Sequence, residues 1–83
     1  MMKNDDTTTH SYRLIFAKNI RKIRRLREIS HERLALDAGC SKTYLCEIES
    51  GTRSVSIDVM GNIAHALDIP LARLLEPIKD EYS

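Results

Sequence analysis

At 83 residues and a formal net charge of +1, the chain is sized for one small domain with a modest core. Its two cysteines, Cys40 and Cys46, form neither a disulfide framework nor a zinc-ligand pattern, so we expect a reducing, cytoplasmic environment. No apolar run approaches the roughly 18 residues of a membrane helix, and no signal peptide is visible. A membrane protein, a zinc protein and a secreted disulfide scaffold are therefore not expected.

The charges are distributed unevenly along the chain. Residues 1–10 carry a net −1, residues 11–53 a net +5 and residues 54–83 a net −3. A basic front half and an acidic back half indicate one surface for a polyanion and another for a different partner. The first residues have no apolar period, so we expect a flexible arm at 1–11 and a single domain at 12–83.

Residues 12–27 have the pattern of an amphipathic helix, with Ser11 as a candidate N-cap. Its apolar positions are Phe16, Ile20 and Ile23, with Ala17 beside them. Its other face is positively charged and contains Arg13, Lys18, Arg21, Lys22, Arg25 and Arg27. A charged face is usually just solvated. Like charges at i and i+4, such as Arg21 and Arg25, are unfavourable unless an anion neutralises them, which favours a position beside phosphates.

A shorter helix is predicted from His31 to Ala38. Ser30 is placed to cap it, and Gly39 can adopt the positive φ that ends it. His31 and Glu32 lie in its first turn, where free backbone N–H groups could hold a phosphate and His31 could donate to it. An ordinary half-exposed position is the alternative for His31.

The next helix begins after a tight turn and is closed by Gly51. Ser41 is its candidate N-cap, with a hydroxyl that can accept from the N–H of Thr43 or Tyr44. Two helices joined by a short turn containing glycine describe a helix-turn-helix, whose second helix enters the major groove of DNA. Other small helical domains have the same caps and stops, so the turn by itself leaves both interpretations open.

Two more helices are predicted in the last third of the chain. Ser56 caps the first, Ile57 to Leu67, and the sequence Asp68-Ile69-Pro70 separates it from the second, about Leu71 to Glu76. The core-facing positions of the longer helix are predicted to be Ile57, Met60, Ile63, Ala64 and Leu67. Gly61 weakens this helix, which a close approach by another helix, in the same chain or in a second subunit, would explain.

Nothing in the sequence indicates an enzyme. There is no nucleophile elbow and no phosphate-cradling glycine loop, and the three histidines, His10, His31 and His65, are widely separated. We therefore expect no catalytic residue, no cofactor, no metal and no small-molecule ligand.

The stretch from Phe16 to Leu75 resembles the phage-repressor and Cro family of helix-turn-helix DNA-binding domains. The matching segments are Ile20-Arg21-Lys22-Ile23-Arg24, Ser30-His31-Glu32-Arg33-Leu34-Ala35, Tyr44-Leu45-Cys46-Glu47-Ile48-Glu49-Ser50-Gly51 and Ile63-Ala64-His65-Ala66-Leu67. The resemblance implies an all-α, compact five-helix lambda-repressor-like domain with the helix-turn-helix at helices 2–3. It also implies a sequence-specific transcriptional regulator that binds a palindromic operator as a homodimer.

Within that family the chain looks most like the controller proteins of restriction–modification systems, with a small phage-type repressor as the neighbouring possibility. This follows from its length, from the Lys42-Thr43-Tyr44 start of the recognition helix and from the segment Gly51-Thr52-Arg53-Ser54-Val55-Ser56-Ile57. The alternative is an antitoxin-type interaction module that binds a toxin and its own promoter, with the acidic C-terminal third facing a basic partner.

The resemblance also implies roles for individual residues. Base reading falls to Lys42, Thr43 and Glu47, and contact with the DNA backbone to His31, Ser41, Tyr44, Thr52 and Arg53. Lys42 would donate to guanine, and Glu47 would accept from cytosine or orient Lys42 or an arginine. Arg24 and Glu49 match an internal salt bridge. Relatives usually have glutamine where His31 stands, so its phosphate contact would become pH-dependent.

The dimer is predicted to form through the last two helices. The candidate interface residues are Val59, Met60, Gly61, Leu71, Leu75 and Ile78. Ile78 and Tyr82 are apolar residues in a charged tail and either cap the core or join this interface. The predicted partners are double-stranded DNA, a second copy of the chain and RNA polymerase.

Overall fold

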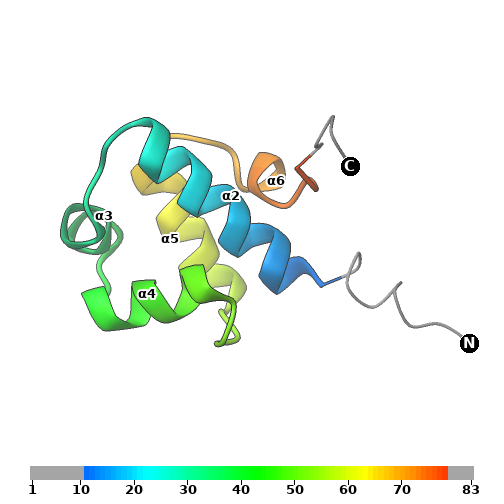
Figure 1. Cartoon of the computed structure of the whole chain (residues 1–83), viewed down its shortest axis with the longest axis horizontal. Helices are drawn as coiled ribbons and strands as arrows, with labels where there is room; N and C mark the ends of the chain where they lie inside the picture. Colours follow the sequence, from blue (N-terminus) through cyan, green and yellow to red (C-terminus); the bar gives the residue numbers. More distant parts are fainter. Residues whose placement is uncertain (1–10, 79–83) are drawn as a thin grey trace, which may run out of the picture.

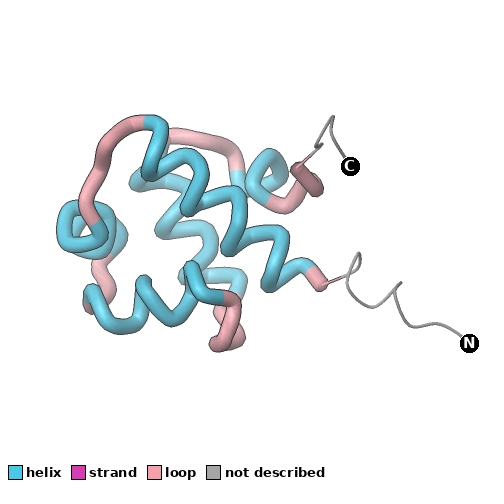
Figure 2. Tube along the Cα trace, in the orientation of Figure 1, coloured by secondary structure: helices cyan, strands magenta, loops and turns pink. Residues whose placement is uncertain are grey.

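Five helices follow one another along residues 11–78, the part of the chain that this computed structural model describes, and that part contains no strand (Figures 1 and 2). They are α2 (Tyr12–Leu26), α3 (His31–Ala38), α4 (Lys42–Ser50), α5 (Ile57–Leu67) and α6 (Leu71–Leu74). The predicted all-α fold class is confirmed. The proposed arm, apart from Ser11, and Tyr82 lie outside the described residues.

Serine side chains cap three of the helices as predicted. The Oγ atoms of Ser30, Ser41 and Ser56 accept hydrogen bonds from backbone N–H groups three residues ahead, at 3.0, 3.0 and 3.1 Å. Ser11 occupies the N-cap position of α2, but its side chain makes no capping hydrogen bond. Gly39 (φ 76°) and Gly51 (φ 77°) end α3 and α4 in the left-handed conformation. These local interactions explain why the bounds of α3 and α5 match the prediction residue for residue.

Two helices, α2 and α6, end earlier than predicted, and α5 ends at its predicted residue through a positive φ. α2 stops at Leu26, one residue early, because Glu28 adopts a φ of 56° and the next N–H, of Ile29, returns to the Arg24 carbonyl at 2.9 Å. Asp68 ends α5 in the same way, with a φ of 58°. α6 ends at Leu74 rather than near residue 76.

A buried side chain of α2 fixes the chain after α6. The amide nitrogen of Asn19 donates to the carbonyl of Leu74 at 2.7 Å and to that of Glu76 at 2.9 Å. These two bonds satisfy carbonyl groups at the end of a one-turn helix and tie it to the first helix. Arg27 similarly donates to the carbonyl of Leu67 at the end of α5.

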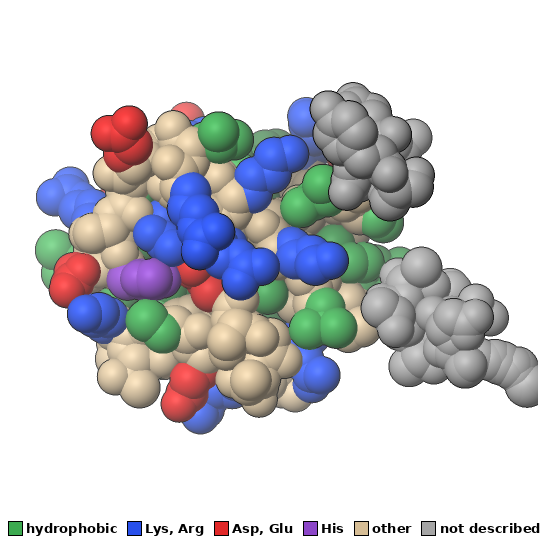
Figure 3. Space-filling view, viewed as in Figure 1, with side chains coloured by type: hydrophobic (Ala, Val, Ile, Leu, Met, Phe, Trp, Pro, Cys, Tyr) green, Lys and Arg blue, Asp and Glu red, His purple; other side chains and the backbone are tan. Residues whose placement is uncertain are grey.

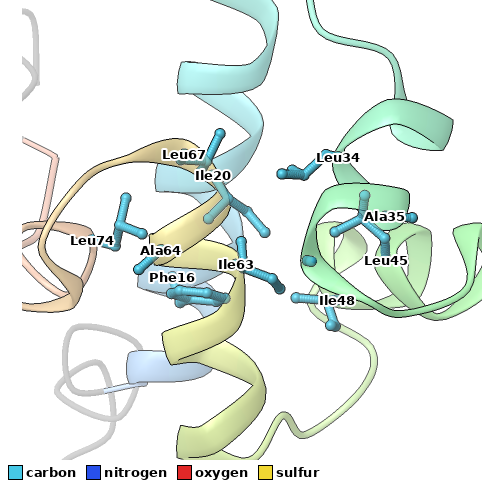
Figure 4. Packing of buried hydrophobic residues seen from close by; sticks show 11 residues of the cluster. Phe16, Ile20, Leu34, Ala35, Leu45, Ile48, Ile63, Ala64, Leu67 and Leu74 are labelled. Atoms are coloured by element: carbon cyan, nitrogen blue, oxygen red, sulfur yellow. The ribbon is translucent and has the colours of Figure 1, made fainter.

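All five helices contribute to one core, which Figure 4 shows from close by. Its largest fully buried side chains are Phe16, Ile20, Leu34, Leu45, Ile48, Ile63, Leu67 and Leu74. Within this core α3 packs against α5, and α2 packs against α4. α4 is anchored by Leu45 and Ile48 at i and i+3, a narrow stripe that leaves the opposite side of the helix outside the core.

The prediction that Ile57 faces the core is wrong, because its side chain is 68% exposed. Val59 and Met60 make the contact with the core from this turn of α5. Side chains on a helix lean toward its N-terminus, so the first residue of α5 extends past the end of the helix and beyond the core. The other predicted positions, Ile63, Ala64 and Leu67, are buried.

None of the five helices has the length and apolar character needed to cross a membrane. Residues 11–78 also contain no group of His, Cys, Asp and Glu side chains arranged to hold a metal ion.

Candidate nucleic-acid interface

The N-terminal half of α4 presents a polar surface. Ser41, Lys42 and Thr43 are exposed, and Tyr44 and Glu47 are half-buried, whereas Leu45 on the same helix is fully buried. The core stripe of α4 therefore turns the predicted base-reading side chains outward. An open hollow lies over this part of the helix, lined by Cys40, Ser41, Thr43, Tyr44, Glu47 and Arg53.

Arg53 is held over α4 by two contacts. Its guanidinium NH1 lies 3.0 Å from Oε1 of Glu47, and its Cζ lies 4.9 Å from the centre of the Tyr44 ring. The first contact is an ion pair, and the second is within the range of a cation–π interaction. Of the two partners considered for Glu47, the structure places an arginine beside it, while Lys42 contacts a different carboxylate. Arg53 is thus positioned by α4 although it lies in the loop that follows.

Lys42 reaches across the turn to α3. Its Nζ lies 3.0 Å from Oε2 of Glu32, and both side chains are exposed, by 56% and 67%. The hydrogen bond to Lys42 lowers the pKa of Glu32, and the same bond raises the pKa of Lys42. The sequence pattern did not predict this contact between Lys42 and Glu32. Spacing within one helix could not reveal it, because the turn is what brings the first turns of α3 and α4 together.

A buried network joins the first three described helices. The Arg24 guanidinium makes two hydrogen bonds to the Glu49 carboxylate, Nε to Oε2 at 2.7 Å and NH2 to Oε1 at 3.1 Å. Its NH1 also donates to the carbonyl of Ile29, just before α3, at 2.9 Å. His31 places Nε2 3.1 Å from Oε1 of Glu49. Since Glu49 is only 5% exposed, this network locks α4 against α2 and α3.

The contact to Glu49 changes the interpretation of His31. This side chain was expected at a DNA phosphate, but in the structure it braces the C-terminal half of α4 and remains 31% exposed. A histidine ring has two nitrogens, so one can contact Glu49 while the other meets a second partner. The two roles are therefore compatible.

The end of α4 is closed by short-range hydroxyl contacts. Ser50 Oγ donates to the Glu47 carbonyl at 2.9 Å and lies 2.8 Å from the hydroxyl of Thr52, which reaches the same carbonyl at 3.3 Å. Thr52, predicted at the DNA backbone, is exposed but already engaged with the helix end. These contacts hold the loop that carries Arg53.

Positive charge gathers on the outer face of α2. Lys18, Arg21, Lys22 and Arg25, which we call the basic cluster, form no ion pair with any acidic residue within 11–78. Figure 3 shows Lys and Arg side chains grouped over the middle of this helix. A groove lined by Lys18, Arg21, Glu49 and Gly51, among others, connects the cluster to the end of α4. The cluster thus borders the helix-turn-helix rather than lying on a remote face.

The two cysteines are free thiols. Cys40 is partly buried against the core, and burial raises the pKa of its thiol, which keeps it protonated. Cys46 is half-buried on α4.

A family model described as helix-turn-helix matches residues 20–74. The chain belongs to the helix-turn-helix family. In this helix-turn-helix domain, α3 and α4 are the two helices of the motif. The family is one of DNA-binding regulators and not of enzymes.

Two relatives of this helix-turn-helix chain are named control proteins. Control protein C.BamHI of Bacillus amyloliquefaciens is 38% identical over 69 residues, which cover 82% of this chain and 85% of that protein. Control protein C.SmaI of Serratia marcescens is 33% identical over 61 residues, covering 74% of this chain and 73% of that protein. Among solved structures, the restriction-modification controller protein C.AhdI from Aeromonas hydrophila matches with a TM-score of 0.71 at 33% identity, covering 77% of this chain and 96% of that one.

The residues predicted to form a dimer lie on α5, on α6 and in the segment that follows α6. Val59, Met60, Gly61, Leu71 and Leu75 are partly buried, and Ile78 is 36% exposed. Outside its own helix, nothing in the described chain lies within 4 Å of the point where a Cβ on Gly61 would stand. No other helix among residues 11–78 therefore packs closely on this glycine.

Proposed function

We propose that this chain is a sequence-specific transcriptional regulator of the restriction–modification controller type, which binds a palindromic operator as a homodimer. The observation that carries the proposal is the outward N-terminal half of α4, locked in place by Leu45 and Ile48 and by the network around Glu49. A helix held rigidly with polar side chains outward is what major-groove reading requires. The likeness to C.BamHI and C.AhdI supports the controller type.

Base reading in this proposal belongs to the exposed start of α4. Lys42 donates to O6 and N7 of a guanine, and Thr43 contacts a thymine methyl group or donates to a base. Glu47 accepts from a cytosine amino group or, through its ion pair, aims Arg53 at the DNA. The close Glu47–Arg53 contact supports the second role.

Contacts with the phosphate backbone surround these readers. Ser41, Tyr44, Thr52 and Arg53 flank α4, and His31 keeps one ring nitrogen for a phosphate. The basic cluster on α2 extends this surface, because it borders the end of α4 and lacks acidic partners within the described chain. Such contacts fix the register of the protein on DNA and account for most of the salt dependence.

The homodimer in this proposal forms through α5 and α6. Apolar side chains there are only partly covered in one chain, and Gly61 leaves room for a partner helix. The two copies of α4 would then lie about 34–36 Å apart, one turn of DNA. Cytoplasmic location fits the two free thiols, and RNA polymerase is the further partner that a transcriptional regulator would meet.

A salt titration of DNA binding tests the proposal. Fluorescence anisotropy would compare labelled DNA from just upstream of the protein's own gene with a random duplex of equal length. Tight binding to the upstream DNA at physiological salt, with log K falling steeply against log[salt] and much weaker binding to the random duplex, is expected. Equal and weak binding to both duplexes would contradict it.

A further inference from the structure

The strongest unexplained contact at the interface is the one between Glu32 and Lys42. A carboxylate of α3 lies 3.0 Å from the ammonium group of a residue at the start of α4. Surface ion pairs of this kind add little to folding stability. Because both side chains are more than half exposed, any DNA that reached Lys42 would also meet the carboxylate.

The position of Glu32 gives that carboxylate two effects on an approaching phosphate. It lies in the first turn of α3, where a negative charge is favoured by the helix dipole and by free backbone N–H groups. The Glu32 carboxylate thereby occupies a position that would suit a DNA phosphate. Its negative charge also repels any phosphate that comes near. A phosphate that took Lys42 from Glu32 would leave two anions close together without their shared cation.

Contact with a base edge does not require Lys42 to leave the Glu32 carboxylate. The lysine ammonium group has three N–H donors, and Glu32 uses one of them, which leaves two for the O6 and N7 acceptors of guanine. These acceptors carry no full charge, so Lys42 can contact a guanine and keep its bond to Glu32. The carboxylate therefore disfavours phosphate contact by Lys42 more than base contact.

We propose that Glu32 is a specificity-determining residue, which holds Lys42 away from DNA phosphates and directs it toward base edges. This inference rests on the proposed function, in which α4 reads DNA. In this proposal Glu32 lowers the total affinity for DNA and raises the ratio of operator affinity to random-sequence affinity. Specificity obtained by disfavouring the wrong complex is a general property of recognition surfaces.

A double-mutant cycle tests the assignment. The proteins are wild type, Glu32→Gln, Lys42→Met and the double variant. Asp37→Asn, made in wild type and in Lys42→Met, is the matched control. Asp37 lies on the same helix, loses the same charge and frees an exposed cation, Arg33, which it contacts at 3.2 Å. Binding is measured between about 0.05 and 0.3 M salt, on a random duplex and on the tightest duplex that wild type selects from a random library. Circular dichroism and thermal melts establish that each variant is folded.

We expect Glu32→Gln to tighten binding to the random duplex by about fivefold and to steepen its salt slope by about 0.9, the value for one added phosphate contact. Binding to the selected duplex should change by less than about twofold, so the specificity ratio falls. In the Lys42→Met background the same substitution should have almost no effect, because the effect depends on the lysine. Asp37→Asn should act equally with and without Lys42.

Two outcomes would overturn the assignment while leaving the proposed function intact. One is an equal gain on both duplexes, and the other is a gain that persists without Lys42; either would mean that Glu32 acts only through general charge repulsion. If wild-type protein selects no duplex and binds none at low salt, the proposed function fails and the assignment fails with it.

Discussion

The side chains of Arg24 and Glu49 join α2 to the end of α4 through two hydrogen bonds, of 2.7 and 3.1 Å, that are almost completely shielded from water. Since His31 and the carbonyl of Ile29 attach to the same pair, the orientation of α4 depends on it. The pair therefore connects folding stability with the placement of the candidate DNA-reading surface.

Glu49→Ala is expected to destabilise the fold strongly. It leaves the Arg24 guanidinium buried without its carboxylate, a change that typically costs about 3–5 kcal/mol. Urea denaturation followed by circular dichroism measures the effect. Asp37→Ala, which breaks an exposed ion pair with Arg33, serves as the control and should change stability by less than about 0.5 kcal/mol. Equal stability of Glu49→Ala and wild type would show that the buried pair does not hold the fold.

Lys42→Ala and Arg21→Ala should weaken DNA binding in different ways. Lys42→Ala removes a base contact, so it should keep the fold and lose about 1–3 kcal/mol of discrimination between operator and altered operator. Arg21→Ala removes a member of the basic cluster, so binding should weaken on all sequences and the salt slope should fall by about one. Anisotropy titrations on the operator and on the altered operator distinguish a loss of discrimination from a uniform weakening. Unchanged operator affinity for Lys42→Ala would mean that another residue reads the DNA.

Gly61→Ala should have opposite effects on the monomer and on the dimer. The structure leaves room for a Cβ at this position, and alanine favours a helix interior by about 0.5–1 kcal/mol over glycine, so the monomer should become more stable. If a partner helix approaches closely here, the added methyl group should weaken dimerisation. Sedimentation velocity over a concentration series reports the dimer, and denaturation at low concentration reports the monomer. A more stable chain with unaltered dimerisation would place the interface elsewhere.

Glu28→Gly should stabilise the turn between α2 and α3. Glu28 adopts a φ of 56°, a left-handed conformation that costs a residue with a Cβ roughly 1 kcal/mol and costs glycine almost nothing. Some of this gain is lost because glycine also frees the unfolded chain, so the net increase should be about 0.5 kcal/mol. Thermal melts of Glu28→Gly against Glu28→Ala provide the comparison, because alanine keeps the Cβ. A gain of the same size in both variants would assign the effect to the lost charge.

The Glu32–Lys42 pair should be intact over a wide range of pH. The folded-state pKa of Glu32 is lowered. The contribution of its carboxylate to folding stability is therefore present above the ordinary carboxylate pKa and is lost as the pH falls through the lowered value. The pKa of Lys42 is raised. The contribution of its ammonium group to folding stability is therefore present below the ordinary lysine pKa and is lost as the pH rises through the raised value. An NMR titration of the Glu32 carboxyl group should show its pKa rising toward the ordinary value in Lys42→Met. An unaltered titration would indicate that the ion pair does not form in solution.

The helix boundaries could be predicted because they depend on neighbours in sequence. Ser30, Ser41 and Ser56 accept from N–H groups three residues ahead, and Gly39 and Gly51 supply the positive φ that ends a helix. The end of α2 at Glu28 was placed one residue too late, because residues with a Cβ seldom adopt a positive φ and no local pattern marks this one, whereas the sequence Asp68-Ile69-Pro70 did mark the end of α5. Local rules thus worked where the preferred residue types were used.

The sequence by itself determined the helices, the fold class and the family, since periodicity, caps and family motifs are written along the chain. Tertiary structure decided which charges meet. It paired Lys42 with Glu32 and Glu47 with Arg53, turned His31 to Glu49, and left Ile57 outside the core. The physical reason is that each of these contacts joins different elements or depends on where one helix ends relative to another. Such distances are set only when all five helices pack around their common core.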